Sequence, residues 1–410
     1  MGDGGGSAEE VRRALAGAVA EQRLRIVASL IRTTGDWDLA EDAVSDAAER
    51  ALLTWPRDGI PDNPAAWLTA TARRRAIDVL RRAAVERGKL ADLAATEPPT
   101  DDAGSDDMLP MTDDRLRLIF TCCHPALSLE ARVALTLKVV SALPTDAIAR
   151  AFLTSEATMS QRLLRAKRKI AHARVPYRVP SDELLPERLE GVLAVLYLVF
   201  AEGYATTSRT LADEAIRLGR LLVELMPDSD ESRALLALML LQHSRRDARE
   251  VAGELVTLEQ QDRTRWDRDA IDAGLALLSS RSGDRGAYAV QADIAAVHAT
   301  ATAAEETRWS EIVALYDELL ALAPSPVVAL NRSIAVGMSD GALAGLAALD
   351  AVAEDPRLAD HHLVAAARGD LLARAGLPDE ALVAIQRAIE LAPTAAERHQ
   401  LEILAGDLHP

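Results

Sequence analysis

The sequence is poor in the residues that form disulfides, metal sites and aromatic clusters. Aromatic residues make up 3% of the chain, and the two cysteines, Cys122 and Cys123, are adjacent. Neighbouring cysteines cannot staple distant parts of a chain, so no disulfide framework is indicated. Zinc ligands usually come in pairs about two to four residues apart, and no second cluster accompanies Cys122, Cys123 and His124. We therefore expect no metal and no cofactor, and a buried or partly buried helix that ends near Pro125.

Long apolar runs and enzyme signatures are missing as well. The longest apolar run, roughly residues 191–201, is shorter than the about 20 residues that span a bilayer. The first residues lack the basic and apolar segments of a signal peptide. The sequence contains no phosphate-binding P-loop, no glycine-rich dinucleotide motif after a strand and no nucleophile elbow. We expect a cytoplasmic protein that has no membrane partner and is not an enzyme.

Helix-forming residues dominate what is present. Ala, Leu and Arg are abundant, hydrophobic residues make up 49% of the chain, and β-branched runs are short. The composition predicts an all-α protein. Its 410 residues are too many for one ordinary core and suit about two to four domains.

Charge is distributed unevenly along the chain. The net charge is −17, which taken alone argues against nucleic-acid binding. Residues 1–180, however, hold 26 Lys and Arg against 25 Asp and Glu, whereas residues 181–410 carry a net charge of −18. Local basic patches bind phosphate whatever the total charge, so any nucleic-acid interface should lie in the first 180 residues.

Four segments follow from the pattern of helices and breaks. Residues 10–91 and 113–175 are expected to form two small helical domains. Residues 92–112 are expected to be an acidic linker, because residues 92–114 hold eight acidic residues, three prolines and no Lys or Arg. Residues 181–410 form an acidic Ala- and Leu-rich extension.

The first domain should contain three helices. Two helices between residues 11 and 53 are expected to break at Thr34-Gly35, with Asp36 able to cap the second. Residues 56–64 are rich in turn residues and predict a loop. A third helix is expected over residues 64–89.

The second of these helices has an acidic outer face. Four positions between residues 40 and 53 are expected to face inward: Val44, Ala48, Ala51 and Leu52. The remaining positions are mostly Asp and Glu. They form either a solvated surface or a docking surface for a basic protein partner.

The third helix has a basic outer face. Its apolar positions recur at helical spacing and should be buried: Leu68, Ala72, Ala76 and Val79 or Leu80. Five arginines fall within residues 73–82, with Asp78 as the one acid among them. This density favours phosphate binding, although a solvated face or a lattice of ion pairs would give the same pattern.

A second basic helix follows a predicted turn near Leu153-Thr154. A short helix over residues 146–152 precedes the turn, and Thr154 is expected to cap the basic helix. Its buried stripe should be Met159, Leu163, Ala166 and Ile170. The order of elements is typical of a helix-turn-helix, whose second helix reads bases in the major groove, although an ordinary basic surface helix is the alternative. The candidate DNA contacts are Ser155, Thr158, Gln161, Arg162, Arg165, Arg168 and Lys169.

The extension contains a repeated helical pattern. Pro324, Pro356 and Pro393 lie 32 and 37 residues apart, each near the end of a helical stretch. Residues 362–393 predict an antiparallel helix pair with its turn at Gly376, and residues 287–324 show the same pattern more weakly. This resembles a tetratricopeptide repeat (TPR), in which helix pairs stack to bury their apolar faces.

The three motifs together, in this order and with the acidic linker, resemble the extracytoplasmic-function (ECF) sigma factors. WDLAEDAVSDAAERALLTW is similar to the region that docks on the clamp helices of RNA polymerase, and NPAAWLTATARRRAIDVLRR to the promoter −10 region. LPTDAIARAFLTSEATMSQRLLRAKRKI is similar to the −35-binding helix-turn-helix. FTCCHPALSLEARVALTLKVV, QDRTRWDRDAI and SPVVALNRSIAV resemble the subgroup with a C-terminal TPR-like extension, which is thought to govern activity.

This resemblance implies a function and a set of contacts. The chain would direct core RNA polymerase to promoter DNA and help to open it. The implied polymerase contacts are Glu41, Asp42, Ser45, Asp46 and Glu49. The implied contacts to the melted −10 element come from the loop over residues 57–63 and the helix after it: Arg57, Asp62, Asn63, Trp67, Thr71, Arg74, Arg75 and Arg81. Only Trp55 and Trp67 supply aromatic rings nearby, so opening should depend on base capture more than on a row of stacked aromatics.

Other functions fit parts of the pattern. A helix-turn-helix regulator with a repeat-type sensor domain would not need the block from residue 41 to residue 82. An enzyme or scaffold would carry the basic helices incidentally. A protein or small-molecule regulator bound by the extension is a further expected partner.

Overall fold

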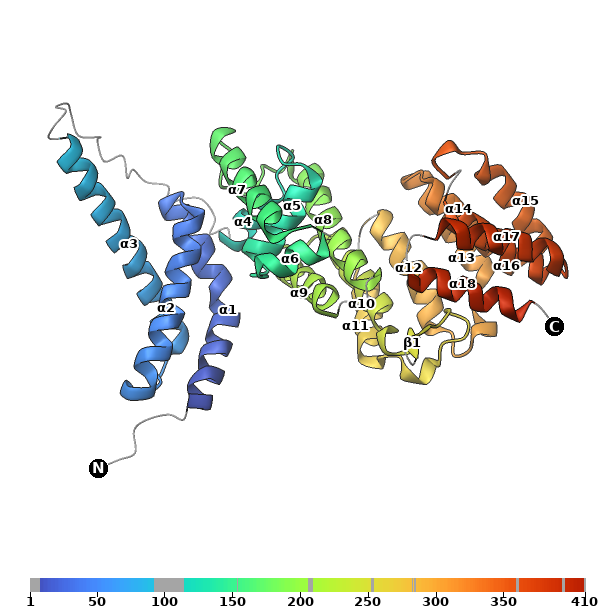
Figure 1. Ribbon diagram of the computed structural model, residues 1–410, viewed down its shortest axis with the longest axis horizontal. Coiled ribbons are helices and arrows are strands. Elements are labelled where there is room, and N and C mark those ends of the chain that lie inside the picture. Colours follow the sequence, from blue (N-terminus) through green and yellow to red (C-terminus); the bar gives the residue numbers. More distant parts are fainter. Residues whose placement is uncertain are drawn as a thin grey trace. The chain divides into compact units, whose positions relative to one another are not determined.

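The computed structural model describes residues 8–91, 114–152, 154–205, 209–251, 254–281, 283, 285–358, 361–392 and 395–408. These residues are almost all helical or in short connections (Figure 1), which confirms the all-α prediction. The structure also contains one short antiparallel ribbon that was not predicted, β1 (Glu250–Val251) paired with β2 (Glu254–Leu255). None of the described helices is both long and apolar enough to cross a membrane. By packing, the chain divides into two compact units, residues 1–198 and residues 199–410.

The first unit opens with three mutually packed helices, α1 (Ala8–Thr34), α2 (Trp37–Asp58) and α3 (Pro64–Ala91). The predicted break between α1 and α2 is confirmed, because Gly35 has a φ of 68° and the Asp36 carboxylate accepts a hydrogen bond from the Leu39 amide at 3.0 Å. Left-handed backbone of this kind suits glycine.

Two details of α2 differ from the prediction. Leu52 is 46% exposed, because the buried stripe runs through Ala47 and Ala51 to Trp55 instead. The helix also continues through Pro56 to Asp58, so the predicted loop begins only at Gly59. Trp55, which is 1% exposed, anchors this last turn against the core, so the expected loop is shortened at its start.

The rest of the first unit begins with α4 (Asp114–Cys122), α5 (Leu129–Leu135) and one π-helical turn (Thr136–Val140). The predicted helix-turn-helix follows as α6 (Thr145–Ala151) and α7 (Glu156–His172). All four predicted stripe residues of α7 are buried: Met159, Leu163, Ala166 and Ile170. In α3, Leu68, Ala72 and Ala76 are buried as predicted, but the fourth stripe position is wrong, because Val79 is only half-buried and Leu80 is exposed.

The residue that caps α7 was predicted wrongly. The backbone amide of Thr154 donates to the Ala149 carbonyl at 2.9 Å, so Thr154 still belongs to the turn that ends α6. Ser155 is the first extended residue, and its hydroxyl accepts from the Thr158 amide at 3.2 Å. Either hydroxyl could cap a helix, and the position of the turn decides which one does.

One helix, α8 (Leu185–Ala205), contains the boundary between the two units. Its residues up to Leu198 belong to the first unit, where Arg188 donates to the Phe120 carbonyl at 3.0 Å. Gly191 on the same face lies close to Cys123, where a Cβ would be 3.9 Å from the Cys123 carbonyl oxygen. The part of α8 before residue 198 therefore packs in the same core as the two cysteines and the helix-turn-helix domain.

The second unit is a succession of antiparallel helix pairs and short 3₁₀ turns. Consecutive helices contact one another along the chain, as the repeat pattern predicted. The helices are α9 (Arg209–Leu225), α10 (Asp230–His243), α11 (Arg268–Ser279), α12 (Ala287–Thr300), α13 (Trp309–Leu322), α14 (Pro326–Asp340), α15 (Ala342–Ala353), α16 (His362–Arg374), α17 (Pro378–Leu391) and α18 (Ala395–Asp407). The 3₁₀ turns are Arg246–Ala248, Arg263–Arg265, Ala304–Glu306 and Pro356–Leu358.

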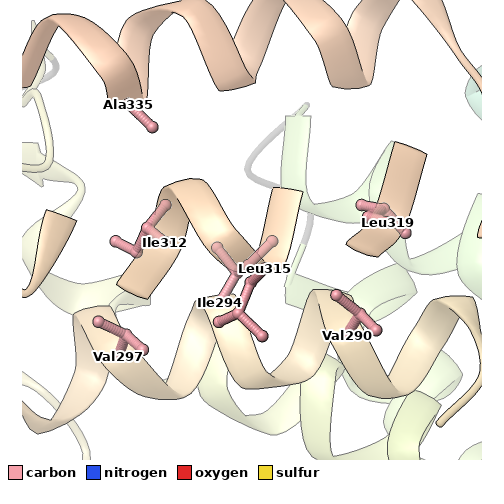
Figure 2. Close-up of a cluster of buried hydrophobic side chains, with 7 residues drawn as sticks. All are labelled: Val290, Ile294, Val297, Ile312, Leu315, Leu319 and Ala335. Atoms are coloured by element: carbon pink, nitrogen blue, oxygen red, sulfur yellow. The ribbon is translucent and has the colours of Figure 1, made fainter. Parts of the chain in front are cut away.

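Small residues and apolar clusters hold these pairs together. Figure 2 shows one cluster in which side chains of α12, α13 and α14 meet: Val290, Ile294, Val297, Ile312, Leu315, Leu319 and Ala335. Helices α14 and α15 approach so closely that a Cβ on Gly345 would lie 2.5 Å from the Gly337 Cα. The turn predicted between α16 and α17 is present at Gly376, with a φ of 76°.

Candidate nucleic-acid interface

The outer face of α7 is polar and largely exposed. Ser155, Thr158 and Gln161 are exposed near its start, and Arg165, Arg168 and Lys169 are exposed further along. Arg162 is half-buried, with its guanidinium carbon 5.3 Å from the centre of the Phe152 ring. The buried stripe thus leaves all seven predicted DNA contacts outside the core. Ser155 and Thr158 also serve the cap, since their hydroxyl oxygens are 2.8 Å apart.

The basic face of α3 is positioned by two tryptophans. The Trp55 and Trp67 rings meet edge to face, with centroids 5.4 Å apart, which sets the start of α3 against the end of α2. Thr71 is half-buried, whereas Arg74, Arg75 and Arg81 are exposed. Arg75 is ion-paired with Asp46 of α2, so the predicted DNA-binding and polymerase-binding faces touch at this pair.

The last turn of α2 and the loop after it hold the other predicted −10 contacts. Arg57 bonds the neighbouring Asp58 carboxylate at 2.7 Å, and this pair raises the pKa of Arg57 and lowers that of Asp58. The Asn63 side-chain oxygen accepts from the Ala66 amide at 2.9 Å and so caps α3. Asp62 is exposed between them. The resemblance implied base capture for Asn63, and the structure gives that residue a structural role as well.

The predicted polymerase contacts lie along one side of α2, and they differ in exposure. Asp42, Ser45 and Glu49 are exposed, and the Ser45 hydroxyl donates to the Glu41 carbonyl at 3.0 Å. Glu41 is different, because its side chain is only 15% exposed. It contacts cations from two other helices.

Lys167 of α7 is the principal partner of Glu41. Its ammonium donates to Glu41 Oε2 and to Asp38 Oδ1, both at 2.7 Å, and its side chain is 13% exposed. Arg23 of α1 adds a longer contact to Glu41 at 3.5 Å. Burial disfavours the Lys167 charge, but Glu41 and Asp38 outweigh it and raise the pKa of Lys167. The helix-turn-helix domain therefore contacts the acidic face of α2 through a charged pair that is largely shielded from water.

Sequence reasoning missed Lys167. It belongs neither to the predicted buried stripe of its helix nor to the predicted DNA contacts. A signal was present, because residue 167 lies four positions after Leu163 and three before Ile170, both of which are buried. A lysine at the flank of a buried stripe extends toward a neighbouring element, whereas its partner, 126 residues away, could not be found from the pattern.

Further hydrogen bonds join the same two domains. The Tyr177 hydroxyl donates to the Ala28 carbonyl of α1 at 2.9 Å, and burial raises the pKa of this phenol. Arg32 of α1 pairs with Asp114 of α4 at 3.0 Å. Arg23 also donates to the Val139 carbonyl at 2.9 Å. Polar contacts are thus spread over several helices of this unit.

The two cysteines lie inside the core of the first unit. Both are free and buried, and burial raises their pKa values, that of Cys123 to about 11. Thiols held protonated in this way are poor ligands and nucleophiles. Among the described residues, no group of His, Cys, Asp and Glu is arranged to hold a metal ion.

Two sigma family models match the segments just described. Sigma-70 region 2 matches residues 18–85, which include α2 and the arginine face of α3. Sigma-70 region 4 matches residues 117–170, which include the helix-turn-helix. The chain belongs to the sigma-70 factors, as an ECF-type member with a C-terminal extension. A sigma factor acts in promoter recognition, with core RNA polymerase and promoter DNA as its partners.

Other similarities concern the extension and the whole chain of this sigma factor. Residues 188–282 match a family of unknown function, DUF6596. An uncharacterized protein of Rhizobium meliloti (strain 1021) is 43% identical over 408 residues, covering 95% of this chain and 96% of that protein. The sigma factor and this relative therefore belong to one family, with the similarity extending over nearly all of both chains. The crystal structure of yeast Tom70 covers 98% of this chain and 86% of its own at 11% identity, with a TM-score of 0.35.

Proposed function

We propose that this sigma factor reads the −35 element with α7, opens the −10 element with the loop before α3 and with α3 itself, and docks on polymerase through α2. One observation carries the proposal. The two basic helices and the acidic helix keep most of their predicted contact residues at the surface, with Glu41 as the main exception, although all three helices are fixed by buried stripes. The exposed side chains would act in the cytoplasm, where polymerase and chromosome meet.

The −35 interaction is the most sharply defined part of the proposal. An N-capped helix can place its first turn in the major groove, where Gln161 would reach a base edge. Arg165, Arg168 and Lys169, further along, would bind bases or phosphates. Lys167 is excluded from that set as long as it bonds Glu41 and Asp38.

Promoter opening is assigned to the other basic surface. Arg74 and Arg81 are exposed on α3 and would follow the backbone of the melted strand. The loop with Asp62 and Asn63 would hold a flipped base. Trp67 packs edge-on against Trp55, so it is suited to supporting that loop as well as to stacking.

Polymerase docking would compete with the contact between α7 and α2. Glu41 cannot face a basic surface of polymerase while Lys167 and Arg23 surround it. We propose that the Lys167 contact opens when the factor joins core enzyme. The free factor would then hold its promoter-reading helix against its own docking helix.

The extension is proposed to regulate this activity. Its strong net negative charge makes it a poor DNA-binding arm and a suitable partner for basic protein surfaces. A variant that ends at Leu198 tests this, because it keeps the whole first compact unit, including the contacts of Arg188 and Gly191. Transcription by this variant should differ from that of the full chain, and identical transcription at every salt concentration would exclude a regulatory role.

In vitro run-off transcription with core polymerase tests the proposal as a whole. DNA that co-purifies with factor and polymerase supplies candidate promoters. The full chain should produce promoter-dependent start sites. Substitution of Arg165 should reduce transcription mainly through −35 binding. Promoter binding without any transcript would favour a helix-turn-helix regulator that is not a sigma factor.

A further inference from the structure

The second unit contains a cavity of about 590 Å³ that the sigma function does not use. It lies along the first helices of three successive pairs, α12, α14 and α16, and α18 adds Leu404. The connection over residues 257–263 closes another side, and α18 contacts strand β2 just before that connection. The volume falls in the range of about 300–1,000 Å³ that is usual for small-molecule sites.

Most of the wall is apolar. Leu330, Ile334 and Met338 come from successive turns of α14, and Leu363 of α16 lies beside them. Leu363 is 44% exposed, which is costly for a leucine unless something covers it. An apolar wall of this kind favours an apolar ligand, because such a ligand loses few hydrogen bonds to water when it enters the cavity.

The charges that line the cavity are already engaged by the protein. Arg374 bonds Glu259 at 2.6 Å and Asp370 at 2.8 Å. Arg263 is 8% exposed, and one of its nitrogens donates to two carbonyls at the end of α12, both at 2.8 Å. Its guanidinium also lies 4.6 Å from the centre of the Trp266 ring. The charges of the four ionised lining side chains, Arg263, Arg374, Glu259 and Asp370, add up to zero. The cavity therefore has no net charge that would attract a charged ligand.

Two polar atoms of lining residues have no hydrogen-bond partner. One is the hydroxyl of Thr307, a residue that is 6% exposed, and the other is Nδ1 of His298. Burial, with Arg245 and Arg263 nearby, lowers the pKa of His298 to about 4, so the ring is neutral near pH 7. A neutral imidazole offers one donor and one acceptor. Both atoms are fully covered by protein, so neither is open to a ligand in the cavity as the side chains stand.

We propose that this cavity binds an uncharged, mostly apolar small molecule, which its apolar wall and its volume both favour. The inference does not depend on the sigma assignment, because every residue in it belongs to the extension. A peptide is the less suitable occupant, since a volume of about 590 Å³ is that of a small-molecule site.

The test uses two dyes that share one ring system. N-phenyl-1-naphthylamine is neutral, apolar and carries a single N–H, whereas 1-anilinonaphthalene-8-sulfonate adds a negative charge. Titration of the full chain near neutral pH, with direct excitation of the dye, should give saturable one-to-one binding of the neutral dye. The anionic dye should bind at least about tenfold more weakly.

Paired variants locate the dye. Asn331→Trp with Leu363→Trp places two indoles at exposed positions that line the cavity. Leu343→Trp with Val383→Trp places two at positions 71% and 72% exposed that do not line it. The first pair should weaken binding of the neutral dye by about tenfold or more, and the second by less than about twofold. Thermal unfolding of both variants checks that they fold.

Three outcomes would overturn the proposal. The neutral dye could fail to saturate, or it could bind both tryptophan pairs equally well. The anionic dye could bind more tightly than the neutral one and respond to the first pair, which would replace the uncharged ligand by an anionic one.

Discussion

Replacing Lys167 by Ala should make this sigma factor bind core polymerase more tightly. The ammonium lies 2.7 Å from Glu41, and both side chains are at most 15% exposed. At an effective dielectric constant of about 20, this separation corresponds to a gross attraction of about 6 kcal/mol. Desolvation of both ions offsets most of it, which leaves a net contribution of about 1–3 kcal/mol to the closed contact. Because Glu41 is then free to face polymerase, affinity for core should rise by about 5- to 150-fold.

The assay is a fluorescence-anisotropy titration of labelled factor with core polymerase in the absence of DNA. Lys169→Ala is the matched control, because it removes an exposed lysine from the same helix. Without DNA, the control should bind core like the unmodified chain. An unchanged affinity for Lys167→Ala would refute the closed-contact reasoning. A decrease would show that Lys167 itself contacts polymerase.

Three further predictions concern DNA binding, packing and pH. Arg165→Ala should weaken binding to a −35 duplex by about 1–3 kcal/mol without altering the melting temperature; equal affinity would remove Arg165 from the interface. Gly345→Ala should lower the free energy of unfolding by about 1–3 kcal/mol because its Cβ would meet Gly337, whereas Gly406→Ala, with nothing within 4 Å, should not destabilise; calorimetry distinguishes them. His298 has a lowered pKa, so its contribution to stability is complete above about pH 6.5 and is lost as pH falls toward 4. His298→Gln should therefore flatten the decline of melting temperature over that interval, and an unchanged slope would contradict the assignment.

The local pattern of the sequence predicted the helices well because burial is periodic. The stripe from Met159 to Ile170 and the break at Gly35 both follow from residues within a few positions of one another. The prediction failed where two neighbouring residues could each fill the same structural role. Thr154 and Ser155 could each cap α7, and only the hydrogen bond from the Thr154 amide to Ala149 decides between them.

Features that depend on contacts between distant residues could not be predicted. Lys167 was given no role, because nothing near it in sequence indicates Glu41. The capping role of Asn63 was missed for a different reason. The same side-chain amide can cap a helix or contact a base, so the residue type alone does not show which of these it does. The cavity near His298 needs several helices in their places before it exists, so no single motif indicates it.

The two buried cysteines can be used to measure local opening of the first unit. Cys122 and Cys123 are the only cysteines of the sequence, and they are at most 2% exposed. A thiol reagent can reach them only when this unit opens locally, so the rate of modification measures how often it opens. Core polymerase, promoter DNA or the Lys167 substitution should each change that rate. The unmodified protein thus provides a kinetic readout that requires no engineered label.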